Sequence, residues 1–252
     1  MSVERFIAPD GMQLAFRYDD FTDPGSEAPH MLLHHSFPKN GDVCWITWVP
    51  HLGRHLRIIR PDLRGFGLSQ VPLETYNPGS DLFIRDYIAL LDYLKIDKVV
   101  WVGEGAGSLL GFTIAAKHPE RISALILCEA VSWIDGDQLN AVAGTGSAGG
   151  HKEKSSSDAV WFGWGNVQSL VKYGTREYAR YRVRNDPQMK QCSKAFHAWY
   201  EEQVAMTDNH RASKAYEALM DVDCRPFLKD IQAPTLLLYG SHSSVSTEED
   251  HK

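Results

Sequence analysis

Three glycines alternate with Glu104 and Ala106 in the segment 103–107, and this pattern has the clearest chemical meaning in the chain. The apolar run 98–102 in front of it predicts a buried strand, and the residues behind it predict a helix. A sharp strand-to-helix turn raises its central side chain above a sheet, where a histidine can deprotonate it to create a nucleophile. The central residue here is Gly105, which has no side chain. The segment therefore predicts the turn that positions a nucleophile but lacks the nucleophilic side chain.

A dinucleotide-binding loop is the alternative interpretation of the same glycines. That fingerprint needs a third glycine and an acidic residue about 20 residues further on. Gly103 and Gly105 match the first two glycines, and Ser108 stands in place of the third. Glu129 ends the next predicted strand as the acidic residue. The partial match leaves this interpretation as a remote alternative.

The carboxylate directly before the central glycine is a second group of chemical interest. We expect the side chain of Glu104 to point beside the pocket rather than into it, because it precedes the apex of the turn. A buried carboxylate with a raised pKa would act there as a general base. The simpler prediction is that Glu104 pairs with a neighbouring polar group.

The elements that must position these residues alternate along the chain. A helix is expected within 43–52, limited by Pro50, and a second over 80–96 with Ser80 as its N-cap. Repeated strand–helix units of this kind predict an α/β fold with a doubly wound, mostly parallel sheet. The predicted strands cover 3–8, 12–18, 30–35, 55–60, 98–102, 122–128 and 233–240.

A long aromatic- and charge-rich stretch interrupts this alternation. We predict a core from 1–130 and 223–252, with 131–222 as a helical cap inserted between its two parts. The Gly/Ser-rich segment 144–157 is expected to be a flexible loop, since it has little apolar surface to bury. The aromatic residues of the cap are expected to line the pocket above Gly105 in part. Those proposed for substrate binding are Trp133, Trp161 and Trp164.

Composition restricts the partners. A formal net charge of −6 without a basic run argues against nucleic acid. Four cysteines without CxxC spacing predict free thiols in a reducing compartment. A charged N-terminal stretch and the lack of an apolar run of about 20 residues predict a cytoplasmic protein without membrane contact. The expected partner is a small molecule, with no cofactor and no metal.

Four segments, in the correct order and spacing, resemble the α/β-hydrolase superfamily. Specifically, they resemble its capped branch of esterases, lactonases, C–C hydrolases, epoxide hydrolases and dehalogenases. The resemblance implies hydrolysis of a small ester, lactone or related carbonyl compound at the turn described above. The segments are HHSFPKNGDVCW, RPDLRGFGLS, KVVWVGEGAGSLLGFTIAAKHPERISALIL and FLKDIQAPTLLLYG.

The resemblance also assigns roles around the central Gly105. The backbone N–H groups of Ala106 and Phe37 become the two oxyanion donors. Ser243 stands where the family usually has its acid, so Glu129 becomes the candidate acid, with a purely structural glutamate as the alternative. The paired histidines at 34 and 35, beside the Phe37 loop, are expected to be structural.

The nucleophile and the histidine are the two departures from the family. Ala106 after the apex favours a serine-type parent over an aspartate-type one, and an engineered change and a natural loss remain open. The family's histidine follows an eighth strand, which we expect this chain to lack, so that 233–240 becomes an exposed edge suited to homodimer formation. The chain is therefore expected to be inactive as given. The alternative is a non-catalytic member that binds a ligand or a partner.

Overall fold

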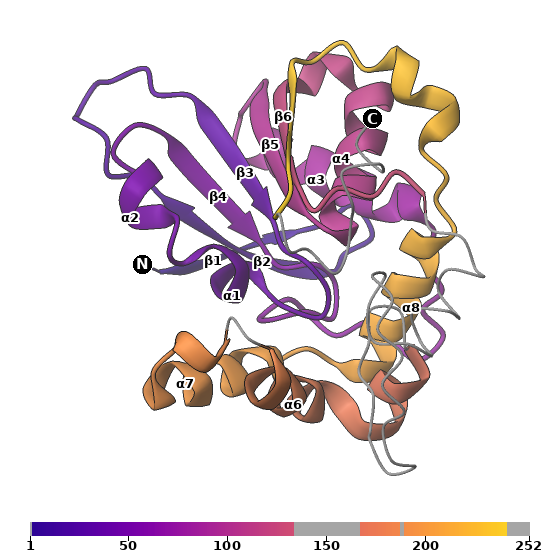
Figure 1. Cartoon of the computed structure of the whole chain (residues 1–252). Coiled ribbons are helices and arrows are strands. Elements are labelled where there is room, and N and C mark those ends of the chain that lie inside the picture. The colour runs from indigo at the N-terminus through magenta and orange to yellow at the C-terminus, as the bar shows by residue number, and fades with distance from the viewer. Residues whose placement is uncertain (1, 134–166, 187–188, 241–252) are drawn as a thin grey trace.

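The computed structural model describes residues 2–133, 167–186 and 189–240 of the chain (Figure 1). Its centre is a seven-stranded sheet with the order β1-β2-β4-β3-β5-β6-β7. β1 and β2 run antiparallel to their neighbours, and the five strands from β4 to β7 are parallel to one another. The strands are β1 (Val3–Ile7), β2 (Gln13–Asp19), β3 (His30–His34), β4 (Arg57–Pro61), β5 (Val99–Glu104), β6 (Ile122–Cys128) and β7 (Thr235–Leu238).

Helices cover both faces of this sheet, as the doubly wound prediction requires. They are α1 (Gly41–Trp45), α2 (Val49–Leu52), α3 (Ser80–Tyr93), α4 (Ala106–Lys117), α6 (Val167–Asn185), α7 (Lys194–Val204) and α8 (Asn209–Met220), with 3-10 turns at Pro119–Arg121, Met189–Gln191 and Arg225–Asp230. The sheet order differs from the 3-2-1-4-5-6 order of dinucleotide-binding folds. The fold therefore gives the dinucleotide interpretation no support.

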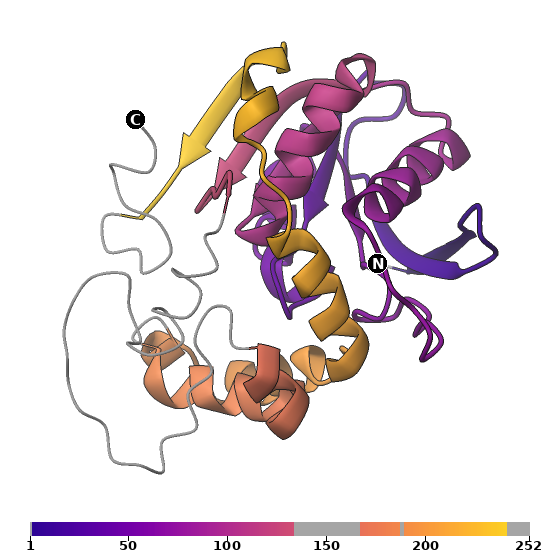
Figure 2. The ribbon, with the colours of Figure 1, turned by 90° about the vertical axis from the view of Figure 1, so that its right-hand side faces the viewer.

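Alternation along the strands divides the core into two layers. In β3, Leu32 packs into the cluster on the α3 and α4 side, whereas Met31 and Leu33 pack against α1 and α2. Ile58 and Ile59 of β4 divide in the same way. Successive side chains of a strand point to opposite faces, so an unbroken apolar run is what a sheet covered on both faces needs. Figure 2 shows α3 and α4 in front of the sheet.

Two helix predictions need correction. The helix expected within 43–52 is two short helices, and Pro50 lies in the first turn of α2 rather than limiting a helix end. Proline fits there because the first N–H groups of a helix have no intrahelical partner. The N-cap of α3 is Gly79, in extended conformation and without a side-chain hydrogen bond, and Ser80 is already helical.

Three helices lie outside the sheet, with α6 and α7 at the bottom of Figure 1 and α8 at its lower right; they are called the cap helices below. α8 connects this layer to the core and binds the loop after β4. Asp208 donates its backbone N–H to the Gly65 carbonyl (2.9 Å), and Lys214 Nζ donates to the Tyr76 carbonyl (2.9 Å). These hydrogen bonds place the cap helices on the loops at one end of the sheet.

None of the described helices is both long and apolar enough to cross a lipid bilayer.

The strand β7 forms one edge of the described sheet. It pairs with β6 from Leu125↔Thr235 to Cys128↔Leu238. Leu236 is 51% exposed, in contrast to the buried central strands. The residues 241–252 that follow it, including Ser243, lie outside the described part of the chain.

Candidate functional site

The turn at Gly105 joins the end of β5 to the first residue of α4. Its backbone has φ 54° and ψ −113°, a combination that residues with a side chain adopt only under strain. Gly105 donates its N–H to the Cys128 carbonyl (2.9 Å). Its own carbonyl accepts from the N–H (2.8 Å) and the Oγ–H (2.6 Å) of Ser108. Hydrogen bonds to β6 and α4 therefore fix the sharp turn that the sequence predicts.

The flanking glycines explain how the turn closes so tightly. A Cβ on Gly103 would lie 2.4 Å from the Gly107 carbonyl oxygen. A Cβ on Gly107 would lie 2.8 Å from His34 Nδ1. Both distances are shorter than real Cβ atoms tolerate, and the first involves backbone that cannot rotate away. The two outer glycines are thus a steric requirement of this turn.

Strand pairing brings the loop after β3 to the same place. β3 and β5 are parallel neighbours, with His34 opposite Gly103. Phe37 and Ala106 each come three residues after their member of that pair, so both candidate oxyanion donors leave the sheet at the same end. The N–H of Ala106 is at the first position of α4, where it has no intrahelical acceptor. Their roles as donors remain a prediction from the resemblance.

An ion pair connects that loop to the residue before the apex. Lys39 Nζ lies 2.8 Å from Glu104 Oε1, as expected for a Glu104 paired with a polar neighbour. Burial by itself raises the pKa of Glu104, but Lys39, with further contributions from Cys44 and Arg182, lowers that pKa below its ordinary value of 4.5. Burial also opposes the charge on Lys39, yet Glu104 raises the pKa of Lys39 above its ordinary value. Both groups are therefore charged at neutral pH, and Glu104 lacks the raised pKa that would tune a general base.

The candidate acid Glu129 follows β6 directly, with φ 51°. It donates its backbone N–H to the Leu238 carbonyl (2.8 Å), and its Oε1 accepts from the Gly240 N–H (2.9 Å). The preceding residue, Cys128, is the one whose carbonyl holds the apex. Glu129 therefore lies at the same end of the sheet as Gly105 and binds backbone beyond β7.

The predicted substrate-binding tryptophans are only partly described. Trp133 lies near the start of the predicted insertion, and the guanidinium of Arg225 lies over its ring, 3.7 Å from the centroid. Arg225 is held in turn by Asp223 through two hydrogen bonds of 2.9 and 2.8 Å. Trp161, Trp164 and the loop 144–157 lie outside the described residues.

The histidines of this region are engaged with backbone. His35 donates from Nδ1 to the Ser36 carbonyl (3.0 Å) and accepts the Leu63 N–H at Nε2 (3.1 Å), which uses both ring nitrogens. His34 donates from Nδ1 to the His35 carbonyl (2.6 Å). Burial lowers the pKa of His35 and lowers that of His34 well below its ordinary value. The neutral, backbone-bonded state of both agrees with the structural role expected for them.

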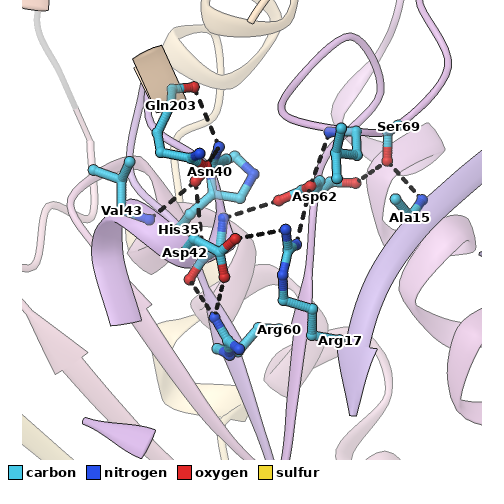
Figure 3. A network of polar contacts seen from close by, with 12 residues as sticks. Ala15, Arg17, His35, Asn40, Asp42, Val43, Arg60, Asp62, Ser69 and Gln203 are labelled. Atoms are coloured by element: carbon cyan, nitrogen blue, oxygen red, sulfur yellow. Dashed lines mark hydrogen bonds and ion pairs between the residues drawn. The ribbon is translucent and has the colours of Figure 1, made fainter. Parts of the chain in front are cut away.

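Sequence reasoning missed a buried ionic network behind the Phe37 loop (Figure 3). Arg60 Nε donates to Asp19 (2.7 Å), and its Nη1 donates to Asp42 (2.5 Å). Arg17 pairs with the other oxygen of Asp42 (2.5 Å). Asp62 accepts the Gly41 N–H (2.9 Å) and thereby holds the start of α1. The sequence feature that could have indicated this network is the RPDLRG segment at 60–65, which places charged residues at the end of an apolar strand and directly after it.

Comparison with known proteins agrees with this architecture. A family model described as the alpha/beta hydrolase fold matches residues 29–147. The 2-hydroxy-6-oxo-2,4-heptadienoate hydrolase of Pseudomonas putida is 36% identical over 127 residues, covering 48% of this chain and 45% of the relative. The 2-hydroxymuconate semialdehyde hydrolase of a Pseudomonas species is 34% identical over 128 residues, covering 48% and 44%. The chain thus spans less than half the length of these curated relatives.

Solved structures match over almost the whole chain. A hydrolase from Pseudomonas aeruginosa superposes with a TM-score of 0.77 at 23% identity and covers 99% of this chain and 84% of the other. The enol-lactonase from Burkholderia xenovorans gives a TM-score of 0.77 at 22% identity, covering 98% and 85%. At these identities the likeness establishes the fold.

Proposed function

Since the chain belongs to the α/β-hydrolase superfamily, we propose that the turn at Gly105 is the position of that family's chemistry in this chain. The proposed parent activity is hydrolysis of a small ester, lactone or related carbonyl compound through a serine-type nucleophile. The observation that carries the proposal is the backbone of Gly105, with φ 54° and ψ −113° between β5 and α4. The names of the relatives, two hydrolases and an enol-lactonase, support the substrate class.

The proposed chemistry follows from the geometry of the turn. A side chain at position 105 would stand at the N-terminal end of α4, a helix of 12 residues whose dipole favours negative charge there. The N–H groups of Ala106 and Phe37 would stabilise the oxyanion that forms when a carbonyl carbon is attacked. Gly105 offers no atom for that attack. We therefore propose that the chain as given does not turn over such substrates.

Restoring a nucleophile tests this proposal. Gly105→Ser, made in a chain extended through an eighth strand with its histidine, is expected to show turnover or a burst on a panel of activated short-chain esters, with the extended chain that keeps Gly105 as the control. Turnover of an epoxide by Gly105→Asp, with none by Gly105→Ser, would assign an aspartate-type parent instead. Absence of activity from both variants in the extended chain would contradict the hydrolase proposal if the turn itself is intact.

A cysteine variant tests the turn independently of any catalytic partner. In Gly105→Cys, the N-terminal end of α4 should lower the thiol pKa and speed alkylation by iodoacetamide. Burial raises the pKa of two native thiols instead, to about 11 for Cys128 and about 12 for Cys224, so these two are a slow internal reference. A new thiol that reacts no faster than these would show that position 105 lacks the environment of a nucleophile.

A non-catalytic role in ligand binding is the second candidate. The observation that favours it is the glycine at the apex, combined with an intact ion pair between Lys39 and Glu104 beside it. We propose that such a member would bind a small carbonyl compound without converting it. Saturable quenching of tryptophan fluorescence by a lactone, with the lactone recovered unchanged, would favour this role. No quenching by any ligand of the panel would count against it.

A further inference from the structure

Asn40 connects two layers of the molecule that are far apart in sequence. It ends the loop 36–40, is 1% exposed, and caps α1 through its side-chain oxygen. Oδ1 accepts the N–H groups of Asp42 (3.1 Å) and Val43 (2.9 Å). That use of the oxygen leaves the Nδ2 hydrogens pointing away from α1.

The amide nitrogen donates to the C-terminal end of α7. Asn40 Nδ2 lies 3.3 Å from the backbone carbonyl oxygen of Gln203 and 3.2 Å from its Oε1 (Figure 3). Gln203 is the penultimate residue of α7, and its carbonyl also accepts the Met206 N–H (3.2 Å) in the turn that ends the helix. One buried side chain thus caps the start of a core helix and binds the end of a cap helix at the same time.

The same loop is also fixed to the core and to α8. Asp62 holds the Gly41 N–H directly after Asn40, and Lys39 directly before it pairs with Glu104. Phe37 packs on Tyr216 of α8, with ring centroids 4.7 Å apart. The loop cannot follow a shift of α7 without giving up these contacts. The two hydrogen bonds of Asn40, already at 3.2 and 3.3 Å, would not survive a further shift of about half an ångström.

We infer that Asn40 is a positioning residue that couples the seating of α7 to the geometry of the loop carrying Phe37. When α7 is seated, Nδ2 binds Gln203 and the loop is held. When α7 moves away, Asn40 loses both acceptors and the loop is released from α7. The consequence for catalysis rests on the proposed function, because it uses Phe37 as an oxyanion donor. The coupling itself does not.

Hydrogen–deuterium exchange on the full chain measures this coupling without any activity. Asn40→Ser keeps a good N-cap for α1 but removes the Nδ2 donor. Loss of these bonds should speed amide exchange about 2- to 10-fold in α7 and in residues 36–43. The segment 36–43, called loop 36–43 here, consists of the loop 36–40 and the first residues of α1. The matched control is Asn209→Ser, which removes bonds of 3.4 and 3.2 Å from Asn209 Nδ2 to the Leu170 and Val171 carbonyls, within the cap helices alone. That variant should speed exchange in the cap helices and leave loop 36–43 unchanged.

A substitution on the cap side gives the converse measurement. Gln203→Leu removes the Oε1 acceptor but keeps the helix and its backbone carbonyl, so exchange in loop 36–43 should rise by a smaller factor than in Asn40→Ser. Gln203→Leu also tests the coupling between α7 and the loop if Asn40→Ser does not fold. Alkylation of Cys44, which accepts the Ser36 N–H at 3.2 Å, should accelerate in parallel as the loop opens.

Two results would overturn the inference. One is faster exchange in loop 36–43 with α7 unchanged in Asn40→Ser, since that describes a lost helix cap alone. The other is an equal response of the loop to Asn209→Ser, since that describes general loosening of the cap helices. Failure of Gly105→Ser to hydrolyse esters would leave these readouts unaffected, so the two proposals fail separately.

Discussion

Lys39 Nζ and Glu104 Oε1 lie 2.8 Å apart and join the Phe37 loop to the residue before the apex of the turn. Their side chains are only 18% and 28% exposed, so the pair is largely shielded from solvent. The two backbone donors proposed for the oxyanion belong to the two segments that this ion pair connects. The pair therefore links the two segments that carry the candidate site.

Removing one partner of this pair should leave the other charge largely shielded from solvent and without that partner. Lys39→Met and Glu104→Gln are each expected to lower the free energy of unfolding by about 1–3 kcal/mol, between the values typical of exposed and buried pairs. The double variant should lose less than the sum of the single losses, with a coupling of about 1–2 kcal/mol measured by urea denaturation. The exposed pair Lys117–Asp81 is the matched control, expected to couple by about 0.5 kcal/mol or less. Additive losses for Lys39 and Glu104 would contradict the prediction.

Gly105 makes a different contribution to stability. Its φ of 54° with ψ −113° is unfavourable for any residue with a Cβ, so Gly105→Ala should destabilise the fold by about 1–3 kcal/mol. Gly79→Ala is the control, because Gly79 has φ −99° and a Cβ added there would meet open space. That change should cost at most about 1 kcal/mol, the loss expected at an N-cap. Thermal melts of both variants check this, and equal melting temperatures would show that the turn is unstrained.

The fold was predictable because apolar runs and small-residue turns are local signals. The runs at 98–102 and 122–128 lie within β5 and β6 or extend them by one residue, and the glycines at 103–107 form the turn they predict. Contacts between distant segments were not predictable in the same way. The bond from Asn40 to Gln203 joins residues 163 apart, and no spacing in the sequence encodes it. The same holds for Arg17 and Arg60, which strand pairing places opposite each other and which share Asp42 of α1 as their partner.

The buried network behind the loop yields a prediction about breaking and replacing ion pairs. Arg60→Met leaves Asp19, 2% exposed, without its Nε donor, and should destabilise the fold by about 3–5 kcal/mol. Adding Asp19→Leu removes the buried carboxylate that Arg60 no longer neutralises, and it should recover part of the lost stability. Guanidinium denaturation of the single and double variants measures both. A double variant less stable than Arg60→Met would show that packing rather than charge decides this site.

His34 and His35 predict how stability depends on pH. Burial lowers the pKa of both below the ordinary value of 6.5, so the folded state keeps them neutral where the unfolded chain takes up protons. A lowered histidine pKa contributes stability above pH 6.5, and that stability is lost as pH falls from 6.5 towards the folded pKa. Each histidine should add up to about 1.4 kcal/mol per pH unit to the slope in that window.

His34→Phe tests this dependence, because it keeps an aromatic ring beside Trp101, whose centroid lies 5.5 Å from that of His34. The variant removes one of the two side chains that take up a proton on unfolding. Its unfolding free energy, measured from pH 7.5 to 5, should therefore fall less steeply than that of the unaltered chain. An identical slope would mean that His34 is protonated in the fold, against the burial and the Nδ1 hydrogen bond to the His35 carbonyl that keep it neutral.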